Sequence, residues 1–195
     1  MLLVGGVILW GAVHSALASQ PAKDAWAHLF GASPARFYRL GYNVFACVSF
    51  VPIAYMLLTF PDHTLYRAPS LLAGAMRVGQ VIAAVALLNT LRHTDALSFA
   101  GVRQLIETER PSRLITHGLY RYVRHPLYTL GLLILWLQPS MTANTLAVFG
   151  AMTVYLLVGA SLEERRLLRE FGDAYRDYRQ STPMLLPRFA SKERA

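Results

Sequence analysis

Two short clusters of charged and aromatic residues carry most of the chemistry in this sequence. The first is HGLYRYVRHPLY, residues 117–128, where Arg121, Arg124 and His125 stand immediately before an apolar run. Guanidinium groups bind carboxylates and phosphates, and tyrosine rings offer flat faces to an adenine or a cation. Pro126 cannot continue an existing helix, so we expect a new helix to begin here with backbone N–H groups available to an anion. The same arginines would also serve simply to orient a membrane span.

The second cluster is a pair of acids, Glu163 and Glu164, where the next apolar run ends. Carboxylates are costly at the edge of a membrane unless they face partners. Glu163 can pair locally with Arg166 at i+3, whereas Glu164 meets only Leu168 at i+4, so a local salt bridge explains Glu163 better than Glu164. If the two clusters meet, the combined site suits a zwitterionic amino-acid group such as that of S-adenosylmethionine.

Composition points to the class of protein that holds these clusters. The 195 residues are 54% hydrophobic and 15% charged, against roughly 45–50% and about 25% in soluble domains, which indicates one membrane-embedded domain. The net charge of +8 is concentrated in residues 23–39, 92–124 and 165–194, which alternate with apolar runs. A membrane topology explains that charge without a nucleic-acid partner. The single Cys47 excludes an internal disulfide.

The apolar runs predict an all-α polytopic protein with about five transmembrane helices. The segment 126–162 lacks charge and is too long for one crossing, so it must form a helical hairpin that turns near residues 138–140. Its first arm, residues 127–138, reaches only ~18 Å. Either that helix begins upstream, or the backbone near Arg124 and His125 lies at membrane depth. The other expected spans are residues 1–18, 44–60, 71–91 and 143–162, followed by a cytosolic C-terminal helix that is broken or bent near Gly172.

Charge also predicts orientation. Cytoplasmic loops of membrane proteins are enriched in Lys and Arg, so we expect the N-terminus outside and the C-terminus in the cytoplasm. Both clusters then lie at the cytoplasmic surface, within reach of a soluble cofactor. Residues 1–18 also resemble a signal peptide at Ala16-Leu17-Ala18, but they lack its basic start, and we expect a retained span.

The motifs LITHGLYRYVRHPLYTLG and EERRLLREFGDAYRDYRQSTPMLLP together resemble the isoprenylcysteine carboxyl methyltransferase and phospholipid methyltransferase superfamily. The resemblance covers residues 99–188 and implies an integral membrane enzyme of the bacterial plasma membrane that binds S-adenosylmethionine. Three N-terminal spans would occupy residues 1–98. Carried over residue by residue, the implied cofactor contacts are His117, Gly118, Leu119, Tyr120, Arg124, His125, Pro126, Tyr128, Glu163 and Glu164.

Two features set this chain apart from the isoprenylcysteine enzymes. We expect an arginine in those enzymes about four residues before the acids, and Gly159 stands there, which argues against a prenylcysteine carboxylate as substrate. The segments HSALASQPAKDAW and RFYRLGYNVF look more like NnrU-type membrane proteins and bacterial thiol methyltransferases. His14 lies in an apolar span and is assigned to helix packing or pocket lining. The histidines lack metal-binding spacing, so no metal site is expected.

The sequence therefore favours methyl transfer from S-adenosylmethionine to a lipophilic or small acceptor, such as a thiol or a lipid amine. His125 and Tyr120 are weak candidates to assist deprotonation, and no strong general base is required. Two alternatives remain open: an NADPH-dependent membrane reductase of the sterol-reductase type, and a non-catalytic or haem-associated NnrU-like protein. The acceptor and the oligomeric state are left open.

Overall fold

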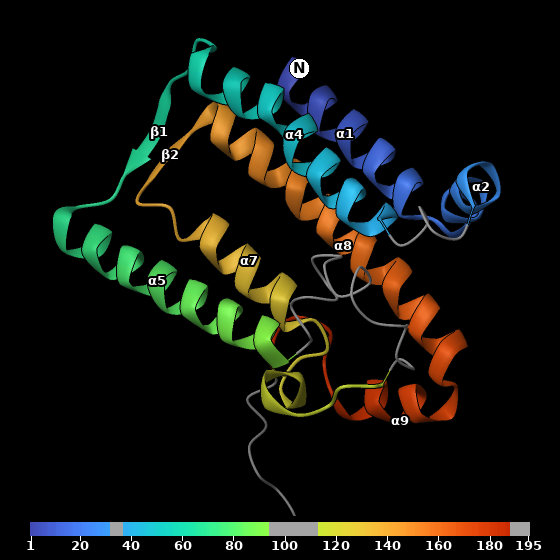
Figure 1. Cartoon of the computed structure of the whole chain (residues 1–195). Helices are drawn as coiled ribbons and strands as arrows, with labels where there is room; N and C mark the ends of the chain where they lie inside the picture. Colours follow the sequence, from blue (N-terminus) through green and yellow to red (C-terminus); the bar gives the residue numbers. More distant parts are fainter. Residues whose placement is uncertain (32–36, 94–112, 188–195) are drawn as a thin grey trace, which may run out of the picture.

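A computed structural model describes residues 1–31, 37–93 and 113–187 (Figure 1). The helices along the chain are α1 (Leu2–Ala18), α2 (Gln20–Phe30), α4 (Tyr38–Thr59), α5 (Ser70–His93), the 3₁₀ turn η2 (Gly118–Arg121), α7 (Pro126–Trp136), α8 (Ala143–Phe171) and α9 (Asp173–Ser181). Two short strands, β1 (Thr64–Arg67) and β2 (Ser140–Thr142), pair antiparallel. The prediction of an all-α polytopic membrane protein is confirmed.

Helix length separates full membrane crossings from partial ones. Three helices, α4, α5 and α8, are long and apolar enough to cross a membrane, and α1 with α2 makes a fourth candidate that is bent by 60°. The fifth apolar helix, α7, has 11 residues and begins at Pro126, so it reaches only ~16 Å. The alternative in which this helix begins upstream is therefore wrong. The other alternative, in which the backbone near Arg124 and His125 lies at membrane depth, stays a prediction.

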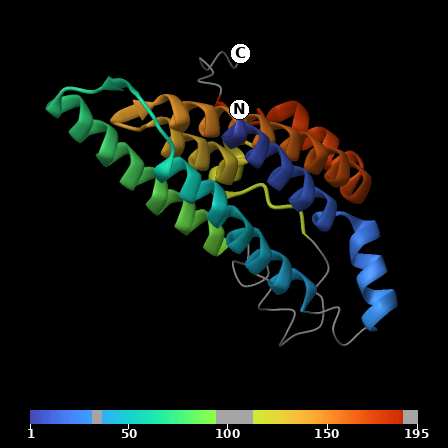
Figure 2. The same ribbon diagram turned by 90° about the horizontal axis from the view of Figure 1, so that it is seen from above.

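The buried apolar cluster lies in one layer of three helices that are side by side, with α1 against α4 and α8 (Figures 1 and 2). Leu3 and Val7 from α1, Ile53 from α4, and Val148 and Phe149 from α8 form the buried cluster. On the other side, α5 packs along α7. Many large apolar side chains stay uncovered, as expected of helices that face lipid.

The end of the bundle away from the charged clusters is tied by the β1–β2 ribbon. Ala143 N donates to His63 O at 3.0 Å, and Asp62 Oδ1 accepts from Asn144 N at 3.0 Å, so the loop before β1 caps the start of α8. Strands this short could not be predicted, because three or four residues carry no usable periodicity.

The C-terminal part returns to the start of α7. The long helix α8 continues without a break past Glu163 and Glu164 to Phe171, and Gly172 at φ +55° ends it before α9 begins. The predicted break near Gly172 is confirmed. The following residues 182–187 run back beside Arg124 and His125, which closes the charged end of the molecule.

Candidate functional site

The backbone just before α7 is held by the returning C-terminal segment. Arg124 N donates to Pro183 O at 2.9 Å, and His125 N donates to Met184 O at 3.1 Å. The Thr129 hydroxyl adds a third bond, to Leu185 O at 2.8 Å. The backbone N–H groups of Arg124 and His125, which immediately precede the helix, are therefore not available to an anion. Buried backbone groups need partners, and a segment far along the chain supplies them.

Arg124 and Glu164 form a buried ion pair. The Arg124 Nε and Nη2 atoms lie 2.7 and 2.6 Å from Glu164 Oε1, and the two side chains are 8% and 9% exposed. Arg124 Nη1 also donates to Arg179 O at 3.0 Å and to Thr182 O. Most of the guanidinium donors are therefore used inside the protein, and Arg124 acts as a clamp on the C-terminal segment rather than as an open anion site.

Glu163 is placed quite differently from its neighbour. Its Oε2 accepts a hydrogen bond from the Tyr128 hydroxyl at 3.0 Å, and 37% of its side chain is exposed. Glu164, for which no local partner was expected, finds its cation 40 residues away in the chain. The local pair expected of Glu163 and Arg166 does not form in the described structure. Of the two acids, Glu163 is the one open to an incoming cation.

His125 lies between the two carboxylates. Its Nε2 is 3.3 Å from Glu164 Oε1, and its Nδ1 is 3.8 Å from Glu163 Oε2. The imidazole stacks on the Tyr128 ring, with centroids 5.4 Å apart and planes inclined by 5°, and only 6% of the residue is exposed. With both ring nitrogens facing acids, His125 positions the carboxylates and the ring of Tyr128.

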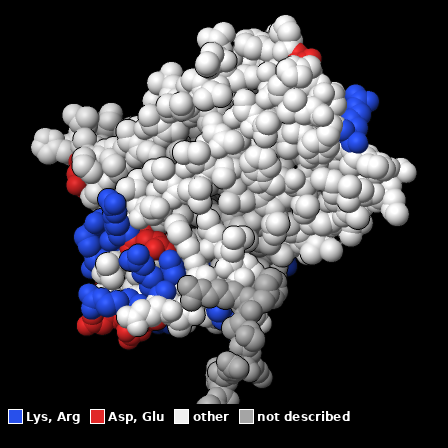
Figure 3. Space-filling view, turned by 180° about the vertical axis from the view of Figure 1, so that it is seen from behind, with Lys and Arg blue, Asp and Glu red and all other residues white. Residues whose placement is uncertain are grey.

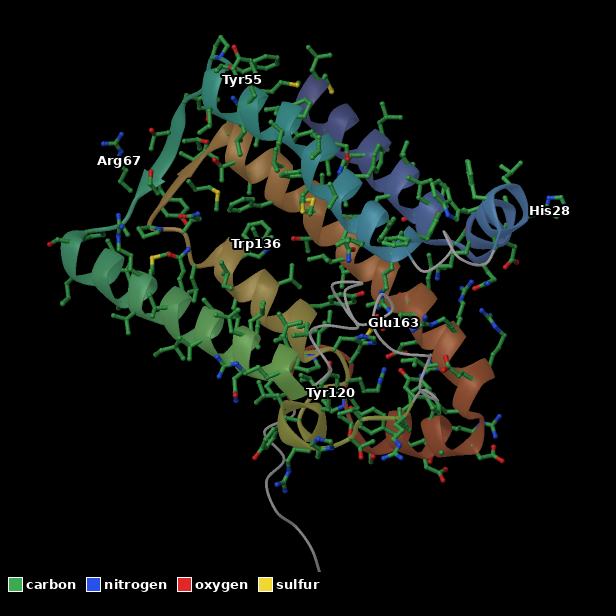
Figure 4. The ribbon with its side chains drawn as sticks, viewed as in Figure 1. His28, Tyr55, Arg67, Tyr120, Trp136 and Glu163 are labelled. Carbon is green, nitrogen blue, oxygen red and sulfur yellow. The ribbon has the colours of Figure 1, made fainter. Side chains whose placement is uncertain are left out.

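The turn η2 forms the other wall of the site, and Figure 4 shows Tyr120 there, on the same side of the bundle as Glu163. The Tyr120 carbonyl accepts a hydrogen bond from the buried Tyr178 hydroxyl at 2.5 Å. Desolvation, followed by the negative charge of Glu163, raises the pKa of Tyr120 to about 12. Tyr120 therefore keeps its proton at physiological pH, which makes it a poor general base.

Gly118 begins the turn at φ +63°, a conformation that L side chains rarely adopt. Among the described residues, no atom lies within 4 Å of where its Cβ would stand. The neighbouring Arg121 guanidinium lies over the Tyr122 ring at 5.4 Å from the centroid. This turn leaves open space at Gly118 and an exposed cation at Arg121.

The structure thus brings together a core of the predicted site: Tyr120, Arg124, His125, Tyr128, Glu163 and Glu164. Pro126 is fully buried beneath them as the first residue of α7. His117, Gly118 and Leu119 lie on the adjoining turn and are exposed. Gly159 lies one helical turn before Glu163, and no described atom comes within 4 Å of its Cβ position.

Residues of α9 and the chain beyond it also build the site, and most of them were not proposed from the sequence. Arg179 Nε lies 3.5 Å from Glu164 Oε2. Tyr175 is 1% exposed, and its hydroxyl has no hydrogen-bond partner in the described part of the chain. Tyr175 and Tyr178 are both buried. The sequence did not indicate that these α9 residues adjoin the charged cluster, because their position depends on the direction in which the chain turns at Gly172.

These residues fit one part of S-adenosylmethionine well. A half-exposed carboxylate beside two aromatic rings is a site for a cation, and the cofactor carries both an ammonium and a sulfonium. The open surface at Gly118 and the exposed Arg121 suit the rest of a zwitterion. Phosphates fit less well, because Arg124 is already neutralised by Glu164.

Comparison with known proteins gives a consistent assignment. A family model described as NnrU protein matches residues 2–190. A methanethiol S-methyltransferase from Crocosphaera subtropica is 30% identical, with 97% of this chain and 75% of the relative covered. A methanethiol S-methyltransferase 2 from Bradyrhizobium diazoefficiens is 33% identical over 95% of this chain and 72% of its own length. No solved structure matches.

Proposed function

Since the chain belongs to the NnrU protein family, we propose that it is a membrane methyltransferase that uses S-adenosylmethionine and methylates a small thiol. The observation that carries the proposal is the half-exposed Glu163 carboxylate, which lies beside the Tyr128 hydroxyl and the His125 ring at the charged end of an apolar bundle. The relatives named as methanethiol S-methyltransferases support a thiol acceptor, and they match nearly the whole chain.

The residues of the site divide into those that bind and those that position. Glu163 binds the cationic part of the cofactor, and the stacked rings of Tyr128 and His125 cover it. The buried pair of Arg124 and Glu164 holds α7, α8 and the C-terminal segment in place around that surface. S-adenosylmethionine supplies a methyl group on a sulfonium, with a neutral thioether as the leaving group.

The chain's own part in catalysis is mainly alignment and exclusion of water. Such chemistry does not require a strong base, which agrees with a Tyr120 that stays protonated and a His125 that faces two acids. Gly159 supplies neither charge nor bulk beside Glu163. A carboxylate acceptor beside Gly159 would have no cation to pair with, and burying an unpaired charge is unfavourable in free energy. An uncharged acceptor is therefore favoured.

The test is methyl transfer by purified protein in lipid vesicles. We expect methyl-labelled S-adenosylmethionine and ethanethiol to give labelled ethyl methyl sulfide, whereas phosphatidylethanolamine and farnesylated cysteine give far less product. Glu163→Gln should lose most of this activity. Equal activity of Glu163→Gln and wild type, or preferred formation of a methyl ester, would contradict the proposal.

A further inference from the structure

The turn η2 carries Tyr120 and is only four residues long. Backbone hydrogen bonds of 3.1 to 3.3 Å join Tyr120 N to His117 O, and Tyr122 N and Val123 N to Leu119 O. A helical turn leaves its last carbonyl groups without partners inside the helix, and 3₁₀ geometry makes its internal bonds poorer than those of an α-helix. A turn this short therefore needs contacts from elsewhere to keep its shape.

A side chain from α9 supplies such a contact. The Tyr178 hydroxyl donates to the Tyr120 carbonyl at 2.5 Å, across 58 residues of sequence. Tyr178 is buried, and burial, followed by the neighbouring Tyr175, raises the pKa of its hydroxyl well above the ordinary value. The hydroxyl therefore keeps its proton at physiological pH and remains a hydrogen-bond donor to the turn.

Tyr178 is itself held in place by the surrounding structure. Its ring packs edge-on against Tyr175, with ring centroids 6.0 Å apart. The carbonyl of the next residue, Arg179, accepts a hydrogen bond from Arg124 Nη1 at 3.0 Å. The same guanidinium pairs with Glu164. The end of α9 that carries Tyr178 is thus anchored to the buried ion pair, so its hydroxyl can act as a fixed support for η2.

Tyr120 links this support to the half-exposed carboxylate of the site. The negative charge of Glu163 contributes, after desolvation, to the raised pKa of the Tyr120 hydroxyl, so the two side chains lie near each other. Glu163 Oε2 also accepts a hydrogen bond from the Tyr128 hydroxyl at 3.0 Å. A displacement of η2 would move Tyr120 relative to Glu163 and Tyr128. Small errors in the placement of a bound reactant reduce activity strongly.

We infer that Tyr178 is a positioning residue for the cofactor site, and that its hydroxyl holds η2 so that Tyr120 stays near Glu163. The inference rests on the proposed function, since it concerns how the site for S-adenosylmethionine keeps its shape. In this role Tyr178 acts through Tyr120 and takes no part in the chemical step. Loss of its hydroxyl therefore weakens cofactor binding and leaves the binding of the thiol unchanged.

The same helix offers a matched control. Tyr175 is also buried, and its hydroxyl has no hydrogen-bond partner in the described part of the chain. We expect Tyr178→Phe to raise the Kd for S-adenosylmethionine about tenfold by calorimetry, as for the loss of one hydrogen bond, while Tyr175→Phe matches wild type. The KM for ethanethiol at saturating cofactor should be unchanged in both variants. Equal cofactor affinities in the two variants, whether normal or reduced, would overturn the inference.

A measurement without cofactor separates this inference from the activity itself. Hydrogen–deuterium exchange of purified protein in detergent reports on the backbone amides of residues 118–123, which include the bonded N–H groups of Tyr122 and Val123. Exchange in this segment should be about fivefold faster or more in Tyr178→Phe and unchanged in Tyr175→Phe. Unchanged protection in Tyr178→Phe would overturn the inference. A wild-type protein whose turn is protected in this way but which binds no S-adenosylmethionine would refute the proposed function, and the link between Tyr178 and the turn would still hold.

Discussion

Adjacent residues can have opposite roles when their environments differ, and Glu163 and Glu164 illustrate this. Glu164 points into the protein and is neutralised by Arg124, while Glu163 faces outward and accepts a single hydrogen bond from Tyr128. A cation approaching the site meets Glu163 without having to break an existing ion pair. Charge alone did not distinguish the two acids in the sequence.

For Glu163→Gln we expect a 10- to 100-fold weaker affinity for S-adenosylmethionine with an unchanged thermal midpoint. Hydrogen bonds to charged groups contribute about 1.5–3 kcal/mol, which corresponds to this range. Isothermal titration calorimetry on purified protein measures the affinity. Asp177→Asn, an exposed acid on α9, is the control. Unchanged affinity in Glu163→Gln would remove this residue from the site.

For Glu164→Gln we expect lower stability as the main effect. Removing one partner of a buried ion pair leaves the other charge uncompensated, which costs about 3–5 kcal/mol. The double variant Arg124→Met, Glu164→Leu should recover much of that loss, because neither charge is then left buried. Thermal unfolding in detergent measures both. If the double variant is less stable than Glu164→Gln, the ion pair stabilises the fold by more than the mutual neutralisation of its two charges.

The raised pKa of Tyr120 leads to a prediction about pH. With a pKa of about 12 in the folded protein and an ordinary value of 10.0, Tyr120 is neutral throughout the physiological range. The folded state keeps a proton that the unfolded chain releases, so stability is lost as pH rises from about 10 toward 12. Methyl transfer should instead rise with pH, because a growing fraction of the acceptor thiol is ionised to the nucleophilic thiolate. The pH–rate profile of Tyr120→Phe should show the same rise. If the rise is lost in this variant, Tyr120 is the general base.

At the scale of elements, long apolar runs were predictable and short contacts were not. The spans 44–60, 71–91 and 143–162 match α4, α5 and α8, because about twenty uncharged residues admit few other structures. The pairing of Arg124 and His125 with residues 183 and 184 could not be predicted, since two backbone bonds between distant segments leave no pattern. The sequence did contain one marker of a helix start. Ser19 is the N-cap of α2, and its side chain accepts a hydrogen bond from Ala22 N.

Gly172 sets the direction in which α9 leaves α8. Its backbone, at φ +55° and ψ −124°, lies in a region that is essentially restricted to glycine, although no described atom crowds its Cβ position. We expect Gly172→Ala to lower the free energy of unfolding by about 1–3 kcal/mol through backbone strain alone. Gly150→Ala, at an uncrowded position inside α8, serves as the control and should be neutral or stabilising. Equal stability of the two variants would contradict this account.

At the scale of the whole molecule, charge is divided between the two ends. Figure 3 shows Lys, Arg, Asp and Glu gathered at one end of the visible face, with a wide uncharged surface and a few charged groups at the other end. The gathered end contains Glu163 and α9, while Arg67 stands at the far end on the β1–β2 ribbon (Figure 4). The uncharged band between them is the part that a bilayer would cover.

This division predicts that the site faces the cytoplasm, where a water-soluble cofactor is supplied. Positive residues collect on the cytoplasmic side of membrane proteins, and the charged end holds most of the arginines of α8 and α9. In a Cys47→Ala background, single cysteines at Arg67 on the ribbon and at Gln180 on α9 report the two sides, because both positions are exposed. An impermeant thiol reagent applied to intact cells should label position 67 and spare position 180 until the membrane is opened. Labelling of position 180 from outside would reverse the orientation and place the carboxylate site away from its cofactor.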